Sequence, residues 1–157
     1  MTNEKMLLNE EQLTDFQYWK KANGSKFSLW DYLFGVSNLE TAIVFTKLFW
    51  PDFVEYDNGI FLKESFSLKI YEEWKIQLKN DIVAIEKVMN HKHLDNMLPG
   101  YETVSDNNSL YLGKIMAEMW GSRLHAVYPN HSFKVECGQD EETIVLTFSQ
   151  ITNPTKV

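Results

Sequence analysis

The two-residue spacing of apolar residues near the C-terminus constrains the fold of this chain most strongly. In residues 132–137 (SFKVEC), Phe133 and Val135 alternate with charged residues, and residues 142–150 (ETIVLTFSQ) continue the same two-residue spacing. Side chains at this spacing lie on one face of a β-strand. The pattern therefore predicts an antiparallel hairpin, joined by the acidic loop of residues 138–142 (GQDEE).

Helical periodicity accounts for much of the remaining chain. A long helix is predicted over about residues 108–128, with Leu112, Met116 and Trp120 on its buried stripe. Shorter helices, each with a residue that can cap its N-terminus, are predicted over residues 10–21 (cap Asn9), 28–35 (cap Ser28), 68–79 (cap Ser67) and 81–90 (cap Asn80).

Residues 37–50 (SNLETAIVFTKLFW) predict a further helix. Ser37 and Glu40 have capping-box spacing, and Pro51 ends the pattern. Apolar residues, among them Ile43 and Val44, occur nearly all round this helix. Because such a helix is typical of a core, we expect it to be buried.

Residues 52–64 (DFVEYDNGIFLKE) predict a second hairpin. A two-residue turn at Asn58 and Gly59 would mix polar and apolar side chains on both faces. A three-residue turn separates them and pairs Tyr56 with Ile60. We therefore expect the three-residue turn, with Gly59 in the left-handed conformation.

These elements predict an α+β fold. We expect an antiparallel sheet built from the two β-hairpins, with five to six helices packed on one face and around its ends. The 157 residues fit a single domain, 1–157, with frayed ends at about 1–8 and 152–157.

The negative net charge of the chain limits the classes of partner that it is expected to bind. A net charge of −7 disfavours binding to nucleic acids and to anionic membranes, and it is compatible with a basic protein partner. The first residues lack the pattern of a signal peptide, and Cys137 is the single cysteine. We expect a cytoplasmic protein, monomeric or homodimeric.

Residues 89–96 (MNHKHLDN) contain the strongest candidate metal ligands, His91, His93 and Asp95. On a β-strand, the two histidines would point to one face and could chelate an ion together. They follow a predicted helix, however, where a basic C-terminus is favoured by the helix dipole. We interpret the stretch as a helix terminus with its exit loop, and we predict no metal or other cofactor.

No pattern in the chain predicts catalytic residues. The G-x-S-x-G signature and the Gly-rich phosphate loops are missing from the sequence. Cys137 has the parity of Phe133 and Val135, so we expect it to face the core rather than act as a nucleophile. We therefore lean toward a protein that is not an enzyme.

Exposed acidic and aromatic residues are the candidates for a protein-binding surface. The predicted residues are Glu55, Asp57, Asp140, Glu141, Glu142, Trp30 and Trp50. Some of the aromatic residues could instead line a pocket for a small ligand.

Residues 39–62 and 116–150 resemble uncharacterised small bacterial α+β proteins, some of which are immunity partners of toxins. The resemblance implies a non-enzymatic protein-binding module, and in its sharpest form an immunity-type inhibitor of a basic bacterial toxin. Two alternatives stay open. One is a metal-binding protein or metal-dependent enzyme that uses His91 and His93, and the other is a small-ligand binding domain.

Overall fold

The structure, a computed structural model, describes residues 7–152; the predicted frayed ends lie outside the described residues except for residues 7, 8 and 152. In the described part the fold is α+β, as predicted. The helices are α1 (Thr14–Asn23), α2 (Leu29–Val36), α3 (Leu39–Phe49), α4 (Leu68–Gln77), α5 (Ile82–Met89), α6 (Leu94–Met97) and α7 (Asp106–Val127). The strands are β1 (Phe53–Tyr56), β2 (Gly59–Leu62), β3 (Lys92–His93), β4 (Phe133–Asp140) and β5 (Thr143–Gln150).

The C-terminal hairpin forms as the alternation predicts. β4 and β5 pair antiparallel, with Cys137 opposite Leu146, and β3 pairs with the other edge of β5 to give the order β3-β5-β4. β4 continues to Asp140, so the predicted acidic loop shortens to a turn at Glu141 and Glu142. The alternate residues of β5 that are buried, with the α7 residues they pack against, form the main core: Ile144, Leu146, Phe148, Met116, Trp120 and Leu124.

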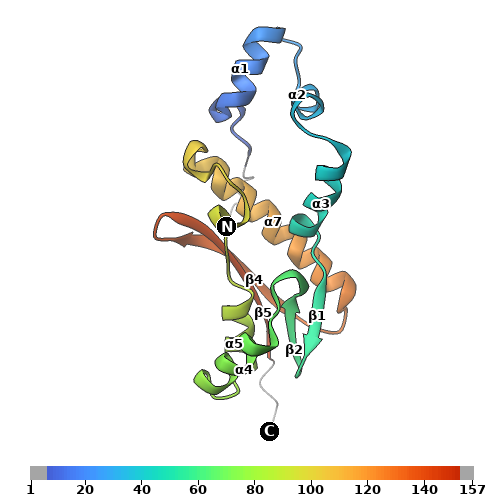
Figure 1. Cartoon of the computed structure of the whole chain (residues 1–157), viewed down its shortest axis with the longest axis vertical. Helices are drawn as coiled ribbons and strands as arrows, with labels where there is room; N and C mark the ends of the chain where they lie inside the picture. Colours follow the sequence, from blue (N-terminus) through green and yellow to red (C-terminus); the bar gives the residue numbers. More distant parts are fainter. Residues whose placement is uncertain (1–6, 153–157) are drawn as a thin grey trace, which may run out of the picture.

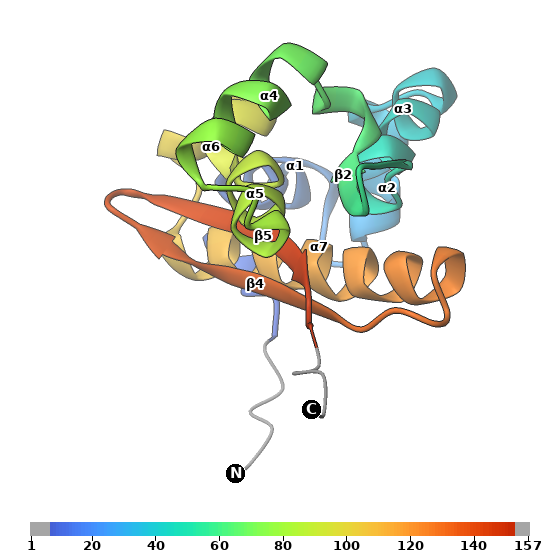
Figure 2. The ribbon, with the colours of Figure 1, turned by 90° about the horizontal axis from the view of Figure 1, so that it is seen from below.

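Helices cover both faces of this three-stranded sheet. α7 packs against the face of β5 that carries Leu146, and it runs along β4 and β5 (Figure 2). Thr147, which points to the opposite face, donates a hydrogen bond to the carbonyl of Lys87 in α5 at 2.6 Å. The prediction of helices on one face was therefore wrong.

The first hairpin forms a separate two-stranded sheet, so the prediction of one sheet built from both hairpins was also wrong. The turn of this hairpin is neither the two-residue turn at Asn58 and Gly59 nor the three-residue turn that was predicted. Asp57 and Asn58 both adopt positive φ in a two-residue turn, and Tyr56 pairs with Gly59. The separation of polar and apolar faces did not predict the turn, because β2 is buried on both faces. Ile60 packs into the main core, while Phe61 packs into a second cluster with α4 and α5.

Two buried polar side chains of the α5 region join the two sheets. The Asn90 amide accepts a hydrogen bond from Leu62 N at 3.0 Å and donates to the carbonyls of Ile60 and Phe148 at 3.0 and 3.3 Å. The Glu86 carboxylate accepts from Ile60 N at 2.8 Å and from Gln150 N at 2.7 Å. Without a β-ladder between them, the sheets are held together by these side chains and by the packing of Ile60 and Leu62 into the main core.

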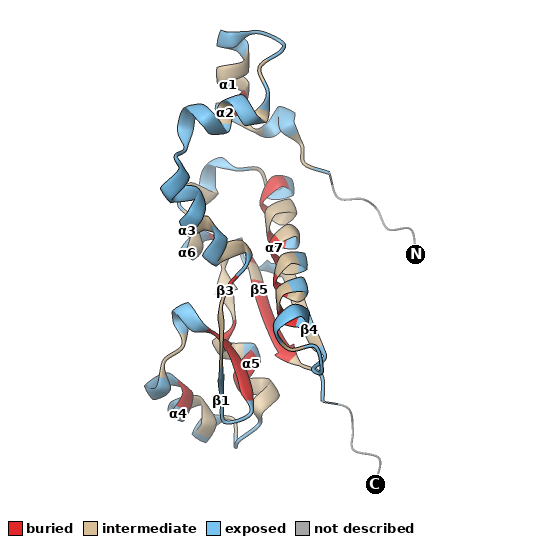
Figure 3. Ribbon diagram, turned by 90° about the vertical axis from the view of Figure 1, so that its right-hand side faces the viewer, coloured by how far each residue is buried: buried red, intermediate tan, exposed pale blue. Residues whose placement is uncertain are grey.

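The first three helices form an arm, which we define as residues 14–49. The arm extends away from the sheets (Figure 1), and most of its ribbon is solvent-exposed (Figure 3). α3 is capped by Asn38, not Ser37, and none of its residues is buried. The prediction that this helix lies in the core was therefore wrong.

Candidate functional site

The arm is fastened to α7 at both of its ends. Just before the arm, the Asn108 side chain accepts a hydrogen bond from Asn9 N at 3.0 Å and donates to Asn9 O at 2.9 Å. At the other end, the Trp120 indole donates to the carbonyl of Leu48 at 2.7 Å. The intervening helices depend mainly on contacts within the arm.

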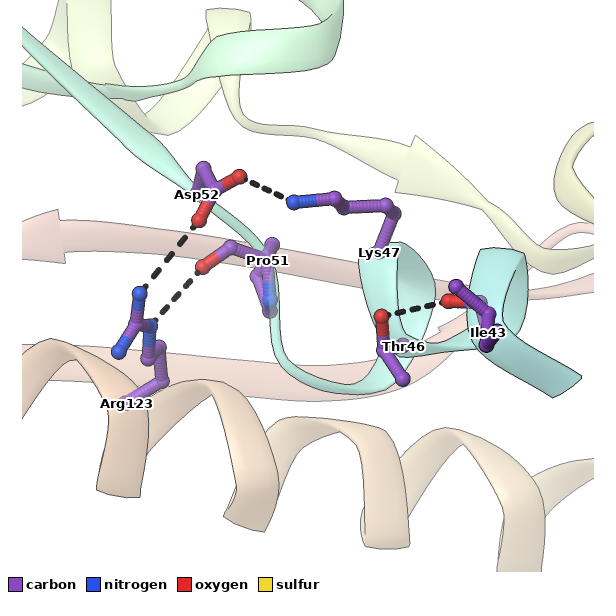
Figure 4. A network of polar contacts seen from close by, with 6 residues as sticks. All are labelled: Ile43, Thr46, Lys47, Pro51, Asp52 and Arg123. Carbon is purple, nitrogen blue, oxygen red and sulfur yellow. Dashed lines mark hydrogen bonds and ion pairs between the residues drawn. The ribbon is translucent and has the colours of Figure 1, made fainter.

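A polar network completes the second attachment (Figure 4). The Arg123 guanidinium donates to the carbonyl of Pro51 at 3.3 Å and to the Asp52 carboxylate at 3.4 Å. The other Asp52 oxygen accepts from Lys47, and the two cations hold the pKa of the Asp52 carboxyl below its usual value. Arg123 also lies over the Trp50 ring, 5.7 Å from its centroid, so this predicted binding residue is partly engaged by the protein itself.

Aromatic side chains pack α1 against α2. Phe16, which is buried, lies edge-on to Tyr32, and the Trp19 ring also meets Tyr32 edge-on. Gly35 permits this approach, because a Cβ there would lie 2.9 Å from the Trp19 ring. The Tyr32 hydroxyl donates to Asp15 at 2.5 Å, and this bond, with burial, raises the pKa of Tyr32 to about 12.

Apolar side chains make up much of the exposed surface of α2 and α3. On α2, Trp30 and Phe34 are 84% and 91% exposed, and their i, i+4 spacing places them on one face. In the described part of the chain, eight of the seventeen exposed large apolar residues belong to the arm: Tyr18, Trp30, Leu33, Phe34, Val36, Leu39, Ile43 and Val44. We name the α2 and α3 residues in this set the apolar face. Large contiguous apolar patches on a protein surface mark interaction sites.

Of the predicted metal ligands, His93 lies in the edge strand β3, His91 immediately precedes that strand, and Asp95 lies in α6. Lys92 and His93 pair with Leu146 and Val145 of β5. Lys92 points to the core side, where it lines a small pocket with Trp120, and burial lowers the pKa of its amine. His91 and His93 therefore share the other face, and the interpretation of residues 89–96 as a helix terminus followed by a loop was wrong in its second half.

The two imidazoles meet at close range. His91 Nε2 and His93 Nε2 are 3.2 Å apart, and the ring planes are inclined at 62°. Burial and the neighbouring charge of His93 lower the pKa of His91, while Asp140 acts in the opposite direction. Asp140 joins the pair as a third candidate ligand, since the ligand atoms of all three residues lie within 4.8 Å of one another.

Asp95, the carboxylate that the sequence placed with the histidines, lies outside this group. Its Oδ1 accepts a hydrogen bond from the Thr143 hydroxyl at 2.9 Å. Asp95 does line the same open hollow of about 670 Å³ as His93, together with four other carboxylates: Glu102, Asp140, Glu141 and Glu142. No local pattern places Asp140 beside the histidines, because it lies 47 residues from His93 and approaches it only through the β3-β5-β4 order.

The remaining predicted protein-binding residues are distributed over separate elements. Asp57, in the turn of the first hairpin, accepts hydrogen bonds from Tyr71 at 2.8 Å and from Lys75 at 2.6 Å, so its carboxylate serves the fold. Glu55 is exposed on β1. Trp30 is the one among the predicted residues that lies on the apolar face.

Among the described residues, no helix is both long and apolar enough to cross a membrane. Comparisons of the chain with protein-family models, with curated proteins and with solved structures found no match.

Proposed function

We propose that the chain is a non-enzymatic protein-binding module, and that a second copy of the chain occupies the apolar face of α2 and α3. The proposal rests on the exposure of Trp30, Phe34, Leu39 and Ile43. These residues lie on an arm that contacts the rest of the chain, which we call the body, mainly through α3 and α7. Burial of these side chains against an identical face would be isologous, as in most dimers.

The solvent-accessible area of the chain is large enough to include a dimer interface of standard size. The accessible surface is 11267 Å², whereas a compact monomer of 18.4 kDa exposes about 8,200 Å². At the exposure of an unfolded chain, the eleven residues outside the description account for at most about 1,900 Å² of the difference. More than about 1,000 Å² remains for the described residues, and a standard interface buries about 800 Å² on each partner.

Charge favours a second copy over a strongly basic partner at this face. Residues 14–49 contain four lysines and three acidic residues, so the arm has a net charge of +1 and the rest of the chain −8. Two arms therefore meet without the repulsion that the acidic bodies would cause. Helices as short as α2 and α3 are also marginal alone in water, and an interface would stabilise them.

The mass of the chain in solution tests this proposal. Sedimentation velocity over a series of concentrations should show twice the chain mass at micromolar protein. A single-chain mass that does not change up to about 100 μM would overturn the second copy as occupant.

Binding of a basic protein stays a prediction that concerns the body of the molecule. The carboxylates of the hollow, among them Glu141 and Glu142, would be its contact residues. The most specific version of that prediction is an immunity-type role. It is tested by whether the chain inhibits a toxin encoded by a neighbouring gene.

A further inference from the structure

We infer that His91, His93 and Asp140 bind one divalent transition-metal ion of the zinc type. The ion would lie at the edge of the acidic hollow, between β3 and the turn that joins β4 to β5. This inference does not depend on the arm or on the proposed function.

The separation of the two nitrogen atoms fits a shared ion. Zinc–imidazole bonds are about 2.0–2.1 Å long, so two such nitrogens lie about 3.4 Å apart around a tetrahedral ion and about 2.9 Å apart around an octahedral one. The observed distance of 3.2 Å between His91 Nε2 and His93 Nε2 falls between these values. Imidazole with carboxylate is a donor set that suits zinc and its first-row neighbours.

The histidines are held in place before any ion arrives. Asn90, which immediately precedes them, is fully buried and hydrogen-bonded to Leu62, Ile60 and Phe148. His93 is fixed by its pairing with Val145 in β5. A ligand pair on backbone fixed in this way loses little entropy when it binds an ion.

The third ligand comes from a more adaptable position. Asp140 is exposed at the end of β4, beside the two-residue turn, and its carboxylate lies within 4.8 Å of both ring nitrogens. A shift of about 1–2 Å would complete a three-ligand site at normal bond lengths. Three protein ligands leave a fourth position for water, as in open zinc sites.

A hydrogen bond between two neutral imidazoles would give the same nitrogen separation without any ion. The two readings differ in what they predict for added metal. A simple histidine pair binds Zn²⁺ weakly and does not require Asp140, whereas the proposed site requires all three side chains.

The test is titration of the full-length chain, stripped with a chelator, with Zn²⁺ by calorimetry, and native mass spectrometry for stoichiometry. We expect one ion per chain. Loss of an outer-shell partner weakens metal binding by up to about 100-fold. His91→Ala and His93→Ala each remove a direct ligand, so each should weaken Zn²⁺ binding by more than that. Asp140→Asn should weaken it by at least about 10-fold. Asp140 is exposed at the end of β4, so Asp140→Asn remains informative if a histidine variant fails to fold.

Two matched controls separate ligands from local charge. Asp95→Asn removes a carboxylate of the same hollow, and His125→Ala removes a histidine at the end of α7; both should bind Zn²⁺ within about 3-fold of the unmodified chain. Absence of stoichiometric binding at 100 μM Zn²⁺ would overturn the inference. An equal loss in Asp95→Asn and Asp140→Asn would overturn it as well, because the hollow's charge would then hold the ion.

Discussion

Asn9 and Asn108 exchange a reciprocal pair of hydrogen bonds across 99 residues of chain. The Asn108 side chain, only 4% exposed, binds both the N–H and the carbonyl of Asn9 and so fastens the start of the arm to the first turn of α7. This pair and the Trp120–Leu48 hydrogen bond attach the two ends of the arm to α7.

Replacing Asn108 by Ala should loosen the arm without unfolding the body. Loss of the side chain leaves two backbone groups of Asn9 without their partners, which should lower the free energy of unfolding by about 1–3 kcal/mol. Hydrogen exchange should accelerate in residues 14–36 and remain slow in β5. Asn107→Ala, an exposed neighbour on the same helix, is the control and should behave like the unmodified chain; equal exchange in both variants would contradict this anchor.

The Glu86 carboxylate gives the fold a pH dependence. Burial raises its pKa above the ordinary 4.5, although Gln150 and Ile60 donate hydrogen bonds to the charged form. A carboxyl with a raised folded-state pKa contributes stability below its unfolded pKa, and that contribution is lost as the pH rises through the folded pKa.

Glu86→Gln should therefore change the slope of stability against pH. Between about pH 4.5 and the higher folded pKa, the stability of the unmodified chain relative to the variant should decline as pH rises. Urea denaturation at pH 4.5, 5.5 and 7.5 measures the difference. A difference that is constant with pH, or that grows as pH rises, would show that the folded-state pKa is not raised.

Two glycines of α7 should respond oppositely to alanine. A Cβ at Gly113 would lie 2.6 Å from Ile144 Cγ2 and 2.9 Å from Cys137 Sγ, so Gly113→Ala should destabilise the chain by about 1–3 kcal/mol. At Gly121 the nearest atom would be 3.7 Å away, and the better helix propensity of alanine should stabilise by about 0.5–1 kcal/mol. Thermal unfolding of both variants tests the pair, and destabilisation of similar size at both positions would contradict the close packing at Gly113.

Local signals predicted much of the fold. Ser28 and Ser67 cap α2 and α4 as expected, because capping depends on residues within one turn. The alternation in residues 133–148 fixed the β4–β5 pairing, and Cys137 packs against the core as its parity requires. These features depend on neighbours in the sequence or on one buried face.

Long-range context explains the failures. β2 is buried on both faces, so alternation could not determine the turn at Asp57 and Asn58. β3 is two residues long and exists only because β5 lies beside it, so no local pattern indicated that His93, in the strand, and His91, just before it, would lie on the same side. The apolar composition of α3 indicated burial, but the body of the same chain does not cover it.

Sedimentation velocity of charge variants on the apolar face tests whether a second copy of the chain covers α2 and α3. Phe34→Glu and Ile43→Glu would each place a carboxylate in the proposed interface, whereas Ile76→Glu, on α4 and 80% exposed in the structure, places one outside it. The account predicts a dimer for the unmodified chain and for Ile76→Glu, and dissociation constants raised at least about 30-fold for the other two. Equal self-association of all four proteins, or a monomeric unmodified chain, would contradict the claim that a second copy covers the arm.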